Sequence, residues 1–145
     1  MSVDGSTGKM NISRFSGDEH EPMGEEGTWT IFVYLCGTDL ESEDFYGAAT
    51  DDIIEMLNAS PNDDVRFVIQ TGGTSQWANE LFSADASERY LITGGDIQLV
   101  DSGPRANMGD ASTLTDFLKW GVTEYPAAKM GLVFWDHGGG SITGV

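Results

Sequence analysis

The run TIFVYLC occupies residues 30–36 and is followed directly by Gly37, Thr38 and Asp39. The run is apolar or β-branched throughout, has the length of a β-strand, and does not alternate with polar residues. Such a pattern is typical of a central strand that is covered on both faces. We therefore expect a layered domain that is built around this strand.

A helix and a second strand follow. Between Glu43 and Ala59, apolar residues recur at helical spacing, and SPNDD at residues 60–64 breaks the pattern. The run VRFVIQ at residues 65–70 predicts a second core strand, closed by TGGT at residues 71–74. Strand, helix and strand in this order indicate a right-handed βαβ unit in a parallel sheet.

The rest of the chain predicts three further elements. Residues 88–92 and 97–100 suit a hairpin around TGGD, and a helix capped by Asp110 or Ser112 should run to about Tyr125. A third core strand is expected at residues 129–135. The predicted fold is an open α/β sheet with helices on both faces. Such sheets place their chemistry at the carboxyl ends of the strands, here at residues 37–41, 71–74 and 136–140.

The composition bounds the possible functions. The 145 residues include 7 Lys and Arg against 24 Asp and Glu, which gives a net charge of −17. This charge argues against nucleic acid and anionic membranes as partners, but it allows a basic substrate. No stretch approaches the roughly 20 apolar residues of a membrane-spanning helix. A single cysteine excludes both an internal disulfide framework and a cysteine-rich zinc site.

The sequence predicts that the chain is divided into a leader and a folded region. Residues 1–27 are polar, rich in glycine and acidic residues, and without periodicity, so we predict a flexible acidic leader. The leader lacks the basic and apolar regions of a signal peptide. Residues 28–145 are expected to form a single domain.

The segment DHGGG at residues 136–140 is the most informative for chemistry. It directly follows a predicted buried strand, which would hold His137 rigidly at the solvent boundary. Histidine is suited to proton transfer near neutral pH, and adjacent glycines allow close approach of a substrate and supply N–H groups for an oxyanion. A histidine in a tight structural turn fits the same residues equally well. Phosphate binding is disfavoured, because no Lys-Ser/Thr pair follows the glycines.

Other candidate residues favour structural interpretations. Cys36 follows apolar neighbours, and burial makes a thiol a poor nucleophile. His20 lies among acidic residues of the leader and is expected to be solvated, while NMGD at residues 107–110 suits a turn before a helix. Acidic clusters are expected at solvated helix ends, with calcium binding as the alternative, although none has EF-hand spacing. These clusters are Asp39/Glu41/Glu43/Asp44, Asp51/Asp52 and Asp63/Asp64.

Several blocks of the sequence together resemble the clostripain family of cysteine peptidases. The blocks are WTIFVYLCGTDLE at residues 29–41, NMGD at 107–110, TLTDFLKW at 113–120, YP at 125–126 and WDHGGG at 135–140. Their order and spacing also match the family, from about Trp29 to the last residue.

The resemblance implies a caspase-like three-layer α/β sandwich with a mostly parallel central sheet. It implies a Cys–His dyad in which His137 is the family histidine, and an oxyanion hole to which the N–H of Gly138 contributes. The family's nucleophilic cysteine would lie beyond residue 145, so Cys36 is not that nucleophile. Residues 28–145 would then be the N-terminal (light-chain) part of a caspase-like peptidase domain. The expected partner is a heavy chain of the same precursor, without which the domain is incomplete.

The resemblance also implies further properties of the enzyme. Family members cleave after Arg, and some after Lys; they are often secreted by bacteria, and several are processed internally from a zymogen. The chemistry needs no cofactor, although some members need Ca²⁺. Asp136 is assigned to positioning the strand end. Two alternatives stay open: a non-catalytic binding module that has lost the nucleophile, and an acidic calcium-binding module.

Overall fold

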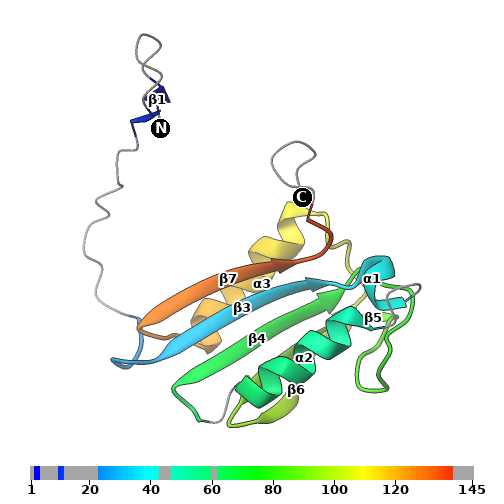
Figure 1. The fold of residues 1–145 in the computed structure, drawn as a ribbon, viewed down its shortest axis with the longest axis horizontal. Helices are drawn as coiled ribbons and strands as arrows, with labels where there is room; N and C mark the ends of the chain where they lie inside the picture. The colour runs from blue at the N-terminus through cyan, green and yellow to red at the C-terminus, as the bar shows by residue number, and fades with distance from the viewer. Residues whose placement is uncertain (1, 4–9, 12–22, 43–46, 60–61, 139–145) are drawn as a thin grey trace.

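A five-stranded sheet forms the centre of the computed structural model, which describes residues 2–3, 10–11, 23–42, 47–59 and 62–138 (Figure 1). Its strands are β3 (Trp29–Cys36), β4 (Val65–Gly72), β5 (Ala86–Thr93), β6 (Asp96–Pro104) and β7 (Lys129–Trp135). The order across the sheet is β6-β5-β4-β3-β7. Strand β3 pairs in parallel with β4 and β7, whereas β5 is antiparallel to both β4 and β6. Only β5 therefore runs against the other strands, which confirms the mostly parallel sheet.

Helices cover both faces of this sheet, as predicted. Helix α2 (Ala48–Ala59) lies over one face and α3 (Ala111–Glu124) over the other (Figure 1). Successive residues of β3 point to opposite faces, so each face receives its own apolar cluster. The cluster under α2 includes Val33, Leu35, Ile69, Ala49 and Ile53. The cluster under α3 is formed by Phe32, Tyr34, Val68 and Phe117. Burial on both faces explains the continuous apolar run in β3.

The first helical region is shorter than the sequence predicts. Gly47 has φ +91°, a left-handed conformation that ordinary residues rarely adopt, and α2 begins at the next residue instead of at Glu43. A five-residue helix, α1 (Thr38–Ser42), precedes it and was not predicted. Glu43 itself lies outside the described residues.

The hairpin and the third helix agree with prediction. Gly94 and Gly95 both have positive φ, which is the requirement of the two-residue turn that joins β5 to β6. Helix α3 passes close to β3, because a Cβ on Gly121 would lie 2.5 Å from a ring carbon of Phe32. Asp110 occupies the N-cap position, but its side chain does not bond to the helix. Its Oδ1 instead accepts a hydrogen bond from Asn107 Nδ2, at 3.2 Å.

Part of the predicted leader is described. Strand β1 (Ser2–Val3) pairs with β2 (Met10–Asn11) in a short antiparallel ladder. Most of residues 1–27, including His20, lies outside the described residues, so the flexible leader stays a prediction. No helix in the described residues is long and apolar enough to cross a membrane.

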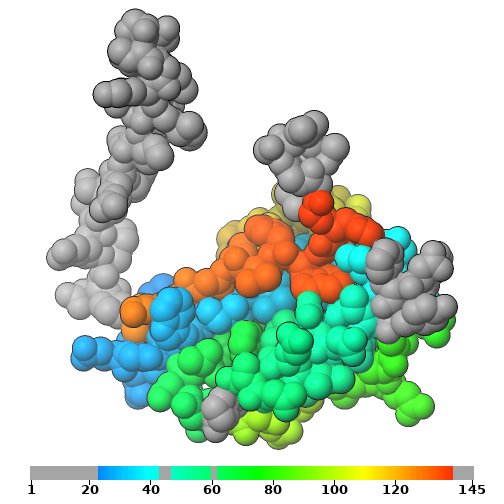
Figure 2. Space-filling view, in the orientation of Figure 1, coloured from blue at the N-terminus to red at the C-terminus, as the bar shows by residue number. Residues whose placement is uncertain are grey.

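Strand β7 forms one edge of the five-stranded sheet. Three consecutive apolar side chains near its end are exposed, namely Leu132 at 39%, Val133 at 44% and Phe134 at 57%. Figure 2 shows this strand, in orange, along the surface of the molecule. The sequence predicts a buried core strand here, so within the described residues one side of β7 lacks its expected cover.

Candidate active site

Three segments predicted to carry chemistry meet at one edge of the sheet. Because β3, β4 and β7 are parallel, their carboxyl ends coincide, with Cys36 opposite Gly72 and Leu35 opposite Trp135. The N–H of Gly37 donates to the carbonyl of Gly72 at 2.9 Å. The hydroxyl of Thr38 donates to Asp136 Oδ1 at 3.3 Å. Residues 37–41, 71–74 and 136–138 therefore form a single connected cluster, called the His137 cluster below.

His137 lies directly beyond β7 and contacts a carboxylate of α1. Its Nε2 is 2.6 Å from Asp39 Oδ1, and both side chains are 52% exposed. The backbone N–H of His137 donates to Asp136 Oδ1 at 2.7 Å. The hydrogen bond with His137 is the main cause that holds the pKa of Asp39 below its ordinary value. His137 is thus an exposed histidine with an ionised partner, a combination suited to proton transfer.

Asp39 is the residue that the sequence interpretation missed. The sequence places it among solvated acidic residues at a helix end, whereas the structure places it against His137. One signal could have revealed it, since both residues follow strands that were predicted to be parallel. The paired strand ends would then lie side by side.

Thr38, between Gly37 and Asp39, has an unusual backbone. Its φ is +45°, a left-handed conformation that costs a β-branched residue about 1–3 kcal/mol. The surroundings hold it there: its carbonyl accepts hydrogen bonds from Thr74 Oγ1 at 2.9 Å and from Ser42 Oγ at 3.1 Å. Such strain persists only where the surrounding structure holds it, and it is found mainly at active sites, ligand clamps and switch regions.

Glu41 corrects another expectation. The sequence interpretation places it at a solvated helix end, but only 2% of it is exposed. Its carboxylate accepts hydrogen bonds from the Thr50 N–H at 3.0 Å, from the Thr50 hydroxyl and from the Ala78 N–H at 2.8 Å. These bonds satisfy the buried charge and tie α1 to α2 and to the loop after β4.

Cys36 lies at the end of β3, half-buried beneath the loop after β4. A Cβ at Gly73 would lie 2.3 Å from its Sγ, and Gly73 has φ +76°. Burial, followed by the charge and hydrogen bond of Asp136, raises the pKa of the Cys36 thiol to about 11. This agrees with the structural interpretation of Cys36, because a thiol with so high a pKa is a poor nucleophile at neutral pH.

Alkylation should therefore spare Cys36 in the folded protein. A pKa raised from 9.0 to about 11 leaves about a hundredfold less thiolate at neutral pH. We expect iodoacetamide to modify native Cys36 about a hundredfold more slowly than the unfolded protein at pH 7, with the rate rising as pH approaches 11. Peptide mapping by mass spectrometry measures this rate at Cys36 alone. Equal rates in the folded and unfolded protein would contradict the assignment.

An apolar cavity of about 380 Å³ adjoins the strand ends on the α3 side. Tyr34, Met108, Leu114 and Phe134 provide most of its apolar wall, and Cys36 and Asp136 also line it. The predicted turn at residues 107–110 forms one side, since the Tyr34 hydroxyl donates to the Met108 carbonyl at 3.0 Å. This turn therefore has the predicted structural role and also shapes a hollow beside the His137 cluster.

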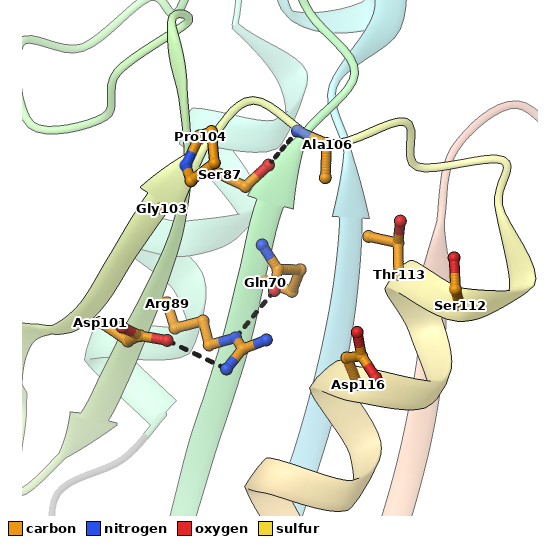
Figure 3. A pocket seen from close by; sticks show the side chains of 10 residues that line it. All are labelled: Gln70, Ser87, Arg89, Asp101, Gly103, Pro104, Ala106, Ser112, Thr113 and Asp116. Atoms are coloured by element: carbon orange, nitrogen blue, oxygen red, sulfur yellow. Dashed lines mark hydrogen bonds and ion pairs between the residues drawn. The ribbon is translucent and has the colours of Figure 1, made fainter.

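A second, polar groove of about 300 Å³ lies between α3 and the β5–β6 hairpin (Figure 3). Arg89 forms its floor, with Nε donating to Gln70 Oε1 at 2.9 Å and Nη1 pairing with Asp101 at 3.0 Å. The guanidinium also lies over the Trp120 ring, 4.5 Å from its centroid. These contacts hold the Arg89 side chain in a structural role. No residue of the His137 cluster lines this groove.

The acidic clusters do not converge in the described part of the chain. Among those residues, no group of three or more His, Cys, Asp or Glu side chains could hold a metal ion. Asp52 accepts a hydrogen bond from Trp135, and Asp63 accepts one from Thr93. Glu43 and Asp44 lie outside the described residues. Calcium binding stays a prediction, which calorimetric titration with Ca²⁺ would test.

Comparison with known proteins identifies the family of this chain. The sequence model of the clostripain family, peptidase family C11, matches residues 33–144. The chain belongs to the clostripain family. Its members are cysteine peptidases, so the chain derives from a family of hydrolases that act on peptide bonds.

Solved clostripain-family structures share its fold. A cysteine protease from B. fragilis is 20% identical with a TM-score of 0.59, over 80% of this chain and 93% of that chain. A clostripain from Bacteroides thetaiotaomicron is also 20% identical, with a TM-score of 0.57, over 79% and 94%. A secreted C11 protease from the same species, iotapain, is 18% identical with a TM-score of 0.56, over 77% of this chain but only 30% of its own. None of the curated protein sequences gives a significant match.

These likenesses confirm the predicted caspase-like α/β fold. They also show that some structures of the family contain much more chain than this one. At such low identity they do not assign roles to single residues, so His137 and Gly138 remain predicted catalytic residues. Gly138 is exposed, and a Cβ placed on it would meet nothing within 4 Å.

Proposed function

We propose that this chain is the His-bearing part of a clostripain-type cysteine endopeptidase that cleaves after Arg or Lys. The observation that carries the proposal is the position of His137 in a clostripain-family fold. His137 is exposed at the carboxyl edge of the parallel strands, with its Nε2 2.6 Å from an ionised carboxylate. A histidine so placed can serve as the general acid and base of a Cys–His dyad.

The nucleophilic cysteine comes from outside these 145 residues. The chain has one cysteine, and its raised pKa makes it unsuited to attack. The proposed source is a heavy chain from the same precursor. Such a chain would continue the sheet at β7, whose apolar residues are exposed and whose outer edge pairs with no other strand among the described residues.

The proposed reaction is acyl transfer. His137 accepts the proton of the cysteine thiol, and the thiolate sulfur attacks the scissile carbonyl carbon. The N–H of Gly138 and that of the nucleophile stabilise the resulting oxyanion. When the intermediate collapses, the C–N bond breaks and His137 donates its proton to the leaving amine. Water then attacks the thioester with His137 as base, which releases the carboxylic acid and restores the thiol.

Two observations support the proposed preference for a basic P1 residue: the net charge of this chain and the inhibitor bound to a related protein. The net charge of −17 favours encounter with cationic peptides, an effect on rate that salt would weaken. The related clostripain from Bacteroides thetaiotaomicron was crystallised with the peptide inhibitor BTN-VLTK-AOMK, whose peptide part ends in lysine. Since iotapain is a secreted protease, we also propose that this protein acts outside a bacterial cell or at its surface.

Active-site labelling tests the proposal. The complete natural protein is treated with an arginyl chloromethylketone, and its chains are weighed by denaturing mass spectrometry. We expect one inhibitor on a second chain, or on the part beyond residue 145, and none on residues 1–145. Absence of any label would favour the non-catalytic binding module. A label on Cys36 would contradict the proposed division of the dyad.

A further inference from the structure

We propose that Asp39 is the positioning residue of the catalytic histidine, and that it holds His137 so that Nδ1 exchanges the proton in the reaction. This inference rests on the proposed function and assigns a role to a residue outside the Cys–His dyad. Its basis is the 2.6 Å contact between His137 Nε2 and Asp39 Oδ1. The low pKa of Asp39, caused mainly by that bond, agrees with an ionised partner.

The contact spans two distant parts of the chain that the fold holds together. Asp39 and His137 are 98 residues apart and follow β3 and β7, which pair in parallel. A second link runs beside it, from the Thr38 hydroxyl to Asp136 Oδ1 at 3.3 Å. Two adjacent residues of α1 therefore contact two adjacent residues beyond β7, which fixes the relative position of the two strand ends.

The backbone before Asp39 is shaped for this contact. Thr38 has φ +45°, and this turn leads from β3 into α1. A Cβ at Gly37 would lie only 3.0 Å from the Thr74 side chain and 3.1 Å from that of Glu41, so the loop after β4 packs closely against the turn. An unfavourable backbone kept by surrounding contacts is typical of a functional constraint.

Glu41 anchors the same short helix from its other side. A five-residue helix is not stable by itself, so tertiary contacts must hold it. Glu41 is buried and bonded to Thr50 and Ala78, while Asp39 is exposed on the same helix. The buried carboxylate thus holds α1, and α1 presents the exposed carboxylate to the histidine.

The contact determines which ring nitrogen carries the proton. An ionised carboxylate only accepts hydrogen bonds, so the neutral ring donates from Nε2 and its Nδ1 is the unprotonated nitrogen. That nitrogen accepts the thiol proton, and the resulting imidazolium stays bound to Asp39. Asparagine at position 39 removes the negative charge of the carboxylate and can donate an N–H to His137 Nε2. This favours the tautomer that carries its proton on Nδ1.

Kinetics of the complete enzyme test the role. Because a general acid–base group contributes about 10²- to 10⁴-fold, a residue that acts through it should contribute less. With an Arg-ending peptide reporter, we expect Asp39→Asn and Asp39→Ala to lower kcat by roughly 10- to 100-fold, with KM within about threefold. Asp51→Asn, at an exposed acidic residue of α2, is the matched control and should keep wild-type kcat. A kcat within threefold of wild type in both Asp39 variants would overturn the proposal.

A second readout separates this inference from the proposed function, because it requires no turnover. Nitrogen NMR of the ¹⁵N-histidine-labelled enzyme reports the protonated ring nitrogen, and His137→Ala assigns the signal. We expect the neutral ring to carry its proton on Nε2 in the wild type, and the Nδ1–H form to appear in Asp39→Asn. A wild-type ring protonated on Nδ1 would overturn the inference even in an active enzyme. An enzyme indifferent to His137→Ala would refute the proposed function itself.

Discussion

Replacement of His137 by alanine in the complete enzyme is expected to lower kcat/KM for an Arg-ending peptide by at least about a thousandfold. Without the imidazole, only the small fraction of cysteine that is ionised at neutral pH can attack, and the leaving amine must depart without a proton from His137. Both steps use the same ring, so one substitution removes both. The side chain is 52% exposed, and its loss should leave the stability of the fold nearly unchanged.

The other histidine of the chain provides the matched control. His20 lies in the predicted leader, and His20→Ala is expected to keep wild-type kcat/KM. The measurement is the initial rate of reporter cleavage, with circular dichroism to confirm that both variants are folded. Cleavage by His137→Ala at more than a tenth of the wild-type rate would remove His137 from the mechanism. The family membership of the chain would stand, but the dyad would need another histidine.

The sequence predicts the sheet strands well because their signal is local. The runs at residues 30–36, 65–70 and 129–135 agree closely with β3, β4 and β7, because each is a mostly apolar run of strand length that shows in the sequence itself. The hairpin follows equally from Gly94 and Gly95, whose positive φ values the turn requires. The order of the strands across the sheet could not be predicted in this way, because it depends on contacts between distant segments that periodicity does not encode.

Helix boundaries and charged residues show where local patterns fail. Helix α1 has five residues, too few to show a helical period, and it exists through the tertiary bonds of Glu41. The burial of that glutamate depends on donors from Thr50 and Ala78, which are 9 and 37 residues away. A carboxylate in a polar stretch gives no sign of such partners, so solvation was the natural but wrong expectation.

The sequence predicts where the candidate site lies, but it does not predict which residues of the site contact each other. Parallel strands bring residues 37–41, 71–74 and 136–140 to one edge, and the structure confirms this for the described residues. The pairing of Asp39 with His137 needs more than the shared edge, because it depends on the left-handed turn at Thr38. A β-branched residue is a poor predictor of that conformation.

Replacement of Phe117 by alanine is expected to destabilise the domain by about 3–5 kcal/mol. Phe117 is fully buried and is the residue of α3 at the centre of the second core cluster. Its ring meets the Phe32 ring edge-on, with 5.9 Å between the ring centroids, and its centroid lies 6.1 Å from that of the Tyr34 ring. Truncation would remove these ring contacts and leave a cavity between α3 and β3 that a rigid sheet cannot close.

Urea denaturation of the complete protein measures this loss, with Thr115→Ala as the control on the same helix. Thr115 is exposed and its hydroxyl donates to the Ala111 carbonyl within the same helix, so its replacement should change stability by less than about 0.5 kcal/mol. A loss below about 1 kcal/mol for Phe117→Ala would mean that α3 is loosely packed. The site would then be affected as well, because α3 and the turn before it form a wall of the apolar cavity beside the strand ends. Tight packing of Phe117 is therefore a condition for that cavity to keep its shape next to His137.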